Sequence, residues 1–417
     1  MTDRSLFVYV DLAGEPHLVG RLWTRSPRGK ESATFEYDDG WLADPSRFAL
    51  EPALTLGKGP HHTAAGRQIF GAIGDSAPDR WGRALMQREE RRKARQEKRA
   101  PRTLLEADYL LGVCDIARQG ALRIAETEGG PFLASGVQIP PLVQLPALLG
   151  AALHVGEGGG NDDDLRLLLA PGSSLGGARP KASVVDRDGH LAIAKFPKND
   201  DLTPVTLWEA VALHLAAKAG IPTPEWRVEN VAGRAVVLLR RFDRQGGARI
   251  AFLSAMSLLD ATDNEPRSYM EIADALRQHG AKAEEDCAQL WRRIVFNILV
   301  SNSDDHLRNH GFLLATAGWR LSPAYDMNPV PVDIKPRILT TAIDEADGTA
   351  SLDLALQVAA HFGVKAGSAK RIAREVGNAV THWRETAAST GISDREIDRM
   401  ASAFAHEELR KAVALSG

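Results

Sequence analysis

Cysteine is scarce in this chain, and no hydrophobic run is long enough to cross a membrane. The 417 residues include two cysteines, Cys114 and Cys287, which lie far apart in unrelated contexts. Such a pair suggests neither a disulfide framework nor a zinc site, so we expect two small buried hydrophobic residues. An apolar stretch such as IVFNILV at residues 294–300 falls far short of the roughly 20 residues that a membrane-spanning helix needs.

A targeting signal and a strong net charge are missing as well. The first residues, MTDRSLFVYV, carry an acid at Asp3 and no apolar signal core, so we expect a cytoplasmic protein without membrane association. A net charge of −3 gives no general attraction to nucleic acid. The content of 44% hydrophobic and 25% charged residues is typical of a soluble globular protein, with length for two or three domains.

A complete Walker A loop is missing, although one glycine-rich segment comes close to it. Residues 172–181 read GSSLGGARPK, and Ala178 stands where the Walker lysine belongs. Small residues still let backbone amides approach phosphate, and Arg179 and Lys181 add positive charge. An ordinary loop between domains is the alternative. A second glycine-rich stretch, residues 156–164, ends in three aspartates that repel phosphate, and we expect a flexible loop there.

Hydrophobic patterning predicts a β-containing front half and a mostly helical back half. Short β-rich runs joined by turn residues indicate strands, and apolar residues at helical spacing indicate helices. The predicted strands are 7–10, 17–22, 182–185, 191–196, 226–228 and 235–239, and the predicted helices include 78–95, 205–219, 284–300 and 368–386. The charged tail of the first helix, residues 88–99, is interpreted as a solvated, salt-bridged surface, with a nucleic-acid contact as the alternative.

Three polar residues in the back half have the spacing of kinase-like phosphotransferases. Asp304 is followed five positions later by Asn309, and Asp326 comes further along in SPAYDMNP. In such enzymes the first Asp orients the attacking hydroxyl, while the Asn and the later Asp hold magnesium on the nucleotide phosphates. Helix caps and turns explain any one of these residues, but they explain the whole set poorly.

Other residues are also compatible with phosphate transfer, but their patterns are less specific. Lys195 in the strand LAIAKF resembles a phosphate-contacting lysine, and Glu209 on the next helix is a candidate partner for it; an edge-strand lysine is the alternative. His306 and His310 are four residues apart, which leaves a zinc site open. The surrounding oxygen ligands suit magnesium better.

Taken together, these segments resemble the HipA family of bacterial serine/threonine kinases, the toxins of type II toxin–antitoxin modules. The motifs that carry the resemblance are SSLGGARPK, LAIAKFP, LLRRFDR, NSDDHLRNHGFLL and SPAYDMNP, with DSAPDRWGRALM nearer the N-terminus. The resemblance implies an α+β, protein-kinase-like two-lobed fold with an all-helical C-terminal lobe. It implies a HipA N-terminal-like subdomain at 1–130, a nucleotide-binding lobe at 131–245 and a helical lobe at 246–417.

The resemblance also implies roles at the phosphates. Asp304 is the expected catalytic residue, and Asn309 and Asp326 are the expected magnesium ligands. Lys195 is expected to contact the phosphates of ATP, and His306 to lie beside the nucleotide.

For the rest of the nucleotide, the resemblance implies backbone contacts. Gly176, Gly177 and Ala178 belong to the expected phosphate loop, and Arg240 and Phe242 to the adenine hinge. Some members have an acid where Arg240 stands, which puts any side-chain role of that residue in doubt. Asp-Met-Asn at 326–328 also replaces the usual kinase DFG.

Regulation and partners follow from the same resemblance. Ser174, with adjacent Ser173 as the alternative, matches a serine that family members autophosphorylate. A cognate HipB-like DNA-binding antitoxin is the expected partner, with DNA reached only through it. The expected substrate is a protein, such as an aminoacyl-tRNA synthetase or another translation protein. Two other functions stay open: a catalytically weak subunit of a DNA-bound repressor complex, and a small-molecule kinase of the aminoglycoside-phosphotransferase type.

Overall fold

The computed structural model describes residues 3–27, 31–133, 138–169 and 177–415. Within these ranges the chain forms two compact units. Unit 1 comprises residues 1–199 and 230–253, and unit 2 comprises residues 200–229 and 254–417. The three-domain division at residues 130 and 245 stays a prediction.

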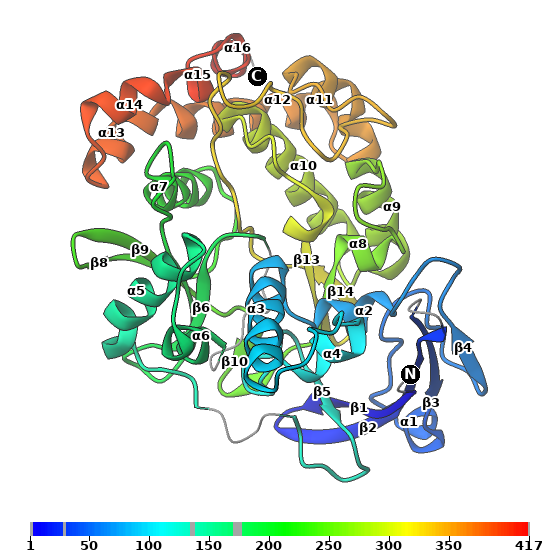
Figure 1. Ribbon diagram of the computed structural model, residues 1–417. Coiled ribbons are helices and arrows are strands. Elements are labelled where there is room, and N and C mark those ends of the chain that lie inside the picture. The colour runs from blue at the N-terminus through cyan, green and yellow to red at the C-terminus, as the bar shows by residue number, and fades with distance from the viewer. Residues whose placement is uncertain (1–2, 28–30, 134–137, 170–176, 416–417) are drawn as a thin grey trace. The chain divides into compact units, whose positions relative to one another are not determined.

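Unit 1 mixes strands and helices, as predicted for the front of the chain (Figure 1). Its strands are β1 (Arg4–Leu12), β2 (Glu15–Arg25), β3 (Ser32–Tyr37), β4 (Pro60–His62), β5 (Leu122–Ala125), β6 (Lys181–Val185), β7 (Leu191–Lys195), β9 (Arg234–Arg240), β10 (Arg244–Gln245) and β11 (Ala248–Arg249). Its helices are α1 (Asp39–Ala43), α2 (Gly71–Asp75), α3 (Arg80–Gln96), α4 (Glu106–Leu111), η2 (Leu142–Gln144), α5 (Leu145–Gly156) and α6 (Asp162–Leu169).

Unit 2 is mainly helical. Its helices are α7 (Val205–Lys218), α8 (Ala255–Leu258), α9 (Tyr269–His279), α10 (Ala283–Val300), η3 (Leu307–Asn309), α11 (Leu352–Val358), η4 (Ala359–Phe362), α12 (Ala366–Thr381), α13 (Trp383–Ser389), α14 (Asp394–Arg399), α15 (Ala401–Phe404) and α16 (Glu407–Ala414). Its hairpin pairs β13 (Gly311–Ala315) with β14 (Gly318–Leu321), which corrects the expectation of an all-helical C-terminal lobe. Two strands, β8 (Trp226–Val231) and β12 (Phe252–Ser254), cross the boundaries between the units.

The predicted N-terminal hairpin forms the centre of a five-stranded antiparallel sheet with the order β4-β3-β2-β1-β5. Ala13 and Gly14 make its two-residue turn with φ of +54° and +95°, a left-handed geometry that matches the twist of paired strands. β1 lies between two neighbours and is almost entirely buried, which explains its continuous apolar run.

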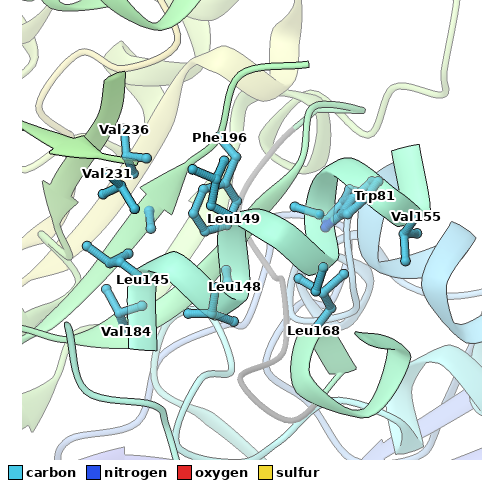
Figure 2. Packing of buried hydrophobic residues seen from close by; sticks show 14 of the residues in the cluster. Trp81, Leu145, Leu148, Leu149, Val155, Leu168, Val184, Phe196, Val231 and Val236 are labelled. Atoms are coloured by element: carbon cyan, nitrogen blue, oxygen red, sulfur yellow. The ribbon is translucent and has the colours of Figure 1, made fainter. Parts of the chain in front are cut away.

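A second antiparallel sheet has the strand order β6-β7-β9-β8. Helices α5 and α6 pack against this sheet through a continuous apolar core. Figure 2 shows Leu148 and Leu149 of α5 and Leu168 of α6 in this core, together with Val184 of β6 and Phe196. The predicted loop at 156–164 is therefore partly wrong, because its aspartates form the first turn of α6. The Asn161 side chain accepts hydrogen bonds from the backbone of that turn, and acids are favourable at a helix N-terminus.

An aromatic cluster joins the helices of unit 2. The ring of Trp208 on α7 lies 6.4 Å from that of Trp383 and 5.9 Å from that of Phe404, and the last two stack at 4.7 Å. The single helix predicted at 368–386 is two helices, because the chain turns at His382 to bring Trp383 into this cluster.

Several simpler expectations agree with the structure. Both cysteines are buried, and no disulfide joins them. In the charged tail of α3, Arg92 pairs with Glu89 and Asp162, and Arg99 pairs with Glu90, as the salt-bridge interpretation predicts. No helix in the described part of the chain is both long and apolar enough to span a bilayer.

A buried carboxylate fixes the end of β9 in unit 1. Asp243 accepts hydrogen bonds from Arg241 at 2.6 Å, from Arg244 at 2.8 Å and from the Gly120 amide at 2.7 Å. Burial acts to raise the pKa of Asp243, but the two guanidinium charges outweigh it and hold the pKa well below the usual range. Arg241 and Arg244 also donate to the Arg118 carbonyl, so the whole RRFDR segment is tied to residues 117–120.

Asp243→Asn tests this anchor. Losing the carboxylate leaves two buried guanidinium groups without their counter-charge, so we expect unit 1 to lose about 3–5 kcal/mol of unfolding free energy. Hydrogen-exchange mass spectrometry of unit 1 in increasing urea measures the change. As a control, Asp188→Asn in the exposed β6–β7 turn should change it by less than about 0.5 kcal/mol. Equal effects of the two substitutions would contradict the assignment.

Comparing the wild type with Asp243→Asn also gives a prediction about pH. An Asp whose folded pKa is depressed contributes its stability above its unfolded pKa of about 3.9 and loses it as the pH falls through the folded value. The stability difference between the wild type and Asp243→Asn should therefore be constant from about pH 5 to 8 and shrink only below about pH 4. Urea midpoints at a series of pH values measure it, and a difference that shrinks near neutral pH would refute the cause given.

Candidate active site

The candidate catalytic loop begins where α10 ends. Ser301 takes a left-handed conformation with φ of +53°, which stops the helix and turns the chain into residues 302–310. Ser303 and Asp305 are buried, whereas the Asp304 side chain is 71% exposed. The loop therefore presents one carboxylate outward from an otherwise buried frame.

Asn309 lies in the same loop and is oriented by it. Its Nδ2 donates to the Asp304 backbone carbonyl at 3.2 Å, which ties the two predicted site residues together. Its Oδ1 is buried and has no hydrogen-bond partner among the described residues. A buried amide oxygen without a donor is costly unless something else binds it, so this atom fits a cation ligand.

Asp326 follows β14 in a strained backbone conformation. Its φ of +57° is uncommon outside glycine, and such residues concentrate at functional sites. Asn328 donates from Nδ2 to the Asp326 carboxylate at 3.4 Å, and its own Oδ1 is buried without a partner in the described part of the chain. The Tyr325 hydroxyl donates to the Arg308 carbonyl at 2.8 Å, which attaches this segment to the catalytic loop.

These oxygen atoms fit magnesium better than the zinc alternative. His310 Nε2 donates to the Asp305 carboxylate at 2.8 Å, so this imidazole is occupied by a buried hydrogen bond. His306 is half-buried at the start of η3. Among the described residues, a trio of His and carboxylate groups close enough to share a metal occurs in the β6–β7 turn and not at His306 and His310.

Sequence reasoning missed the buried network that supports the loop. Asp305 Oδ2 accepts hydrogen bonds from the Tyr269 hydroxyl and from Asn297 Nδ2, the latter at 2.8 Å, besides its contact with His310. Burial acts to raise the pKa of Asp305, but the charge and hydrogen bond of His310 and the bond from Tyr269 lower it overall. The sequence feature that could have revealed this network is the polar Asn297 within the apolar IVFNILV segment at the end of α10.

The network continues to the segment that carries Asp326. Asn302 donates from Nδ2 to Asn297 Oδ1 at 3.1 Å and accepts from the Asn328 amide at 3.2 Å. One chain of hydrogen bonds thus runs from buried Asp305 through Asn297 and Asn302 to residue 328. It sets the positions of both loops that carry the predicted acids.

Unit 1 holds the residues predicted to contact the nucleotide except His306, which lies in unit 2. Lys195 is buried at the end of β7, in register with Val237 of β9. Gly177 and Ala178 lie just before β6, while Gly176 and the predicted phosphorylation sites Ser174 and Ser173 fall outside the described residues.

Lys181 differs from its predicted role in the phosphate loop. Its Nζ lies 2.7 Å from the Asp79 carboxylate, and both side chains are almost fully buried. Asp79 is also the N-cap of α3, accepting from the Gly82 amide at 2.8 Å. Lys181 therefore holds α3 against β6, which leaves Arg179 as the other cation of the predicted pair.

Half-buried and fully buried side chains alternate along the predicted hinge, residues 240–243. Arg240 and Phe242 are half-buried, whereas Arg241 and Asp243 point into the buried cluster described above. The Arg241 amide donates to the Leu191 carbonyl at 2.9 Å, which extends the β7–β9 pairing to this point. No observation tests the nucleotide roles of Arg240 and Phe242, and they stay predictions.

Comparison with solved structures supports the fold. The HipA chain of Shewanella oneidensis MR-1, solved with HipB and operator DNA, superposes with a TM-score of 0.65 at 15% identity, covering 98% of this chain and 96% of that one. At this identity the match shows the fold alone. It confirms the α+β, kinase-like fold predicted from the sequence.

The relatives found by sequence match a smaller part of the chain. Y4mE of Sinorhizobium fredii, whose name proposes a kinase, is 26% identical over 211 residues, covering 42% of this chain and 49% of that protein. Toxin YjjJ of Escherichia coli K12 is 28% identical over 171 residues, covering 38% of each. The chain spans about half the length or less of these relatives.

Family profiles cover both ends of the chain. Residues 10–107 match the HipA N-terminal domain, and residues 173–384, about half of the chain, match the HipA-like C-terminal domain. The second match contains every site residue predicted here, from Ser173 to Asp326. The chain belongs to the HipA family.

Proposed function

We propose that this chain is an ATP- and magnesium-dependent serine/threonine protein kinase that acts as a growth-arresting toxin. The observation that carries the proposal is the exposed Asp304 carboxylate beside the buried, unpartnered Oδ1 of Asn309. An outward carboxylate is open to an incoming hydroxyl, and the rigid loop fixes its direction. The kinase name of the relative Y4mE supports the same chemistry.

In this proposal each residue has one task. Asp304 orients the acceptor hydroxyl and receives its proton, and Lys195 contacts the phosphates of ATP. Asn309 and Asp326 hold magnesium, with the Asn328 oxygen as an additional ligand that the sequence did not predict. Magnesium, when bound, supplies positive charge that neutralises the nucleotide phosphates. Gly176, Gly177 and Ala178 approach the phosphates, and Arg240, Phe242 and His306 border the rest of the nucleotide.

Control and partners are part of the proposal. The solved Shewanella relative is bound to HipB and operator DNA, which supports a HipB-like antitoxin as partner and DNA contact through it. Autophosphorylation of Ser174, or of Ser173, would silence the enzyme. The substrate would be an aminoacyl-tRNA synthetase or another translation protein. The repressor-subunit alternative is disfavoured because the Asp304, Asn309 and Asp326 set is intact.

Asp304→Asn tests the catalytic assignment. We expect phosphate transfer from radiolabelled ATP to fall at least about 100-fold, because a neutral amide cannot accept the proton. The exposed position predicts unchanged folding, which circular dichroism checks. Asp394→Asn, an exposed acid at the start of α14 in the same unit, serves as the control and should keep the wild-type rate. Transfer by Asp304→Asn at the wild-type rate would refute the role of Asp304.

Asn309→Ala tests the magnesium assignment. Removing one oxygen ligand should raise the magnesium concentration for half-maximal phosphate transfer by roughly tenfold. Electron paramagnetic resonance with Mn²⁺ and ATP measures the metal affinity without relying on transfer, and the two measurements should shift together. Asn378→Ala on the exposed face of α12 is the matched control. Unchanged metal affinity in Asn309→Ala would exclude Asn309 as a ligand.

A further inference from the structure

One segment of unit 2 exposes three large apolar side chains, while its two cations hydrogen-bond to the protein. Between residues 331 and 338, Val332, Ile334 and Ile338 are 50%, 47% and 54% exposed. They are three of the eight large hydrophobic side chains exposed in the described part of the chain. Single exposed hydrophobic residues are ordinary, but three within seven residues are a local concentration of exposed apolar side chains, and exposed apolar surface of this kind is one mark of an interaction site.

The two cations of the same segment, Lys335 and Arg337, hydrogen-bond to the protein, whereas Asp333 is exposed. Arg337 donates from Nε to the Ser301 hydroxyl at 3.0 Å and from Nη2 to the Ile298 carbonyl at 2.8 Å. Lys335 donates from Nζ to the Ser303 carbonyl at 3.1 Å. These bonds hold the segment against the end of α10 and the start of the catalytic loop. The exposure of the three apolar residues is therefore built into an anchored backbone.

The patch borders the candidate catalytic carboxylate. Lys335, which lies between Ile334 and Ile338 in the chain, also contacts Asp304 Oδ1 at 3.3 Å. Thr340 adds a bond from its hydroxyl to the Ser303 carbonyl at 3.0 Å. Anything that brings a hydroxyl to Asp304 must therefore lie next to this segment.

The surroundings of Asp304 select among acceptors. An aminoglycoside is a polar polycation and gains nothing from valine and isoleucine side chains, while Lys335 repels it. A polypeptide can place an apolar side chain on the patch and a serine or threonine hydroxyl at Asp304 at the same time. Burying one such side chain is worth enough to set a preference of about tenfold or more.

We propose that Val332, Ile334 and Ile338 form a docking surface for a polypeptide substrate that carries apolar side chains beside its acceptor serine or threonine. The inference rests on the proposed kinase function and adds the substrate class to it. It assigns acceptor selection to the segment that follows Asp326, and phosphate transfer to Asp304.

Two fluorescein-labelled peptides test the surface. One has a central serine with two leucines on each side, and the other has glutamine at those four positions. Binding to the full-length chain is measured by fluorescence anisotropy without nucleotide, and KM and kcat are measured with ATP. We expect the leucine peptide to bind at least about tenfold more tightly, as expected for burying an apolar side chain.

The triple variant V332S/I334S/I338S should lose that preference. Its dissociation constant and KM for the leucine peptide should rise about tenfold, with the change confined to KM rather than kcat because the patch acts in binding. Leu202→Ser, another exposed apolar residue of unit 2, is the control and should retain the preference.

The outcomes separate this inference from the kinase function. Equal binding of the two peptides, binding of neither, an unchanged preference in the triple variant, or competition by an aminoglycoside would each overturn the docking surface. Leucine-peptide binding that the triple variant loses, without phosphate transfer by the wild type, would support the surface and contradict the kinase proposal.

Discussion

The buried carboxylate of Asp305 is the constraint on which the candidate site depends. A carboxylate without water must have its hydrogen bonds satisfied, and Asp305 obtains them from Tyr269, Asn297 and His310. Those three donors come from α9, α10 and the end of the loop, so satisfying one charge brings three parts of unit 2 to a single point. Asp304, the residue before Asp305, is then directed outward.

A buried carboxylate with all its hydrogen bonds satisfied also stabilises the predicted hinge in unit 1. Asp243 is buried and satisfied by Arg241, Arg244 and the Gly120 amide. In both units a fully enclosed carboxylate fixes the backbone next to a residue with a predicted role. In unit 1 those residues are Arg240 and Phe242, which are half-buried.

Local signals predicted several of the strands and helices, and the misses have identifiable causes. The β1–β2 and β6–β7 hairpins and α10 were predictable because turn residues and apolar periodicity act over a few neighbouring residues. The break at His382 was not, because it brings Trp383 onto Trp208 and Phe404, a contact between distant parts of the chain. Lys181 was interpreted as a phosphate-loop cation because its partner, Asp79, is about 100 residues away.

By itself, the sequence determined the family and the α+β kinase-like fold, and it predicted Asp304, Asn309 and Asp326 as site residues, because spacing within short motifs is a local property. Only the tertiary structure decided which neighbouring acid is buried and which is exposed, since Asp304 and Asp305 are the same residue type one position apart. It also decided that Lys335 meets Asp304 and that the apolar residues around it face outward. Burial and hydrogen-bond satisfaction depend on partners far away in the chain, and no motif encodes them.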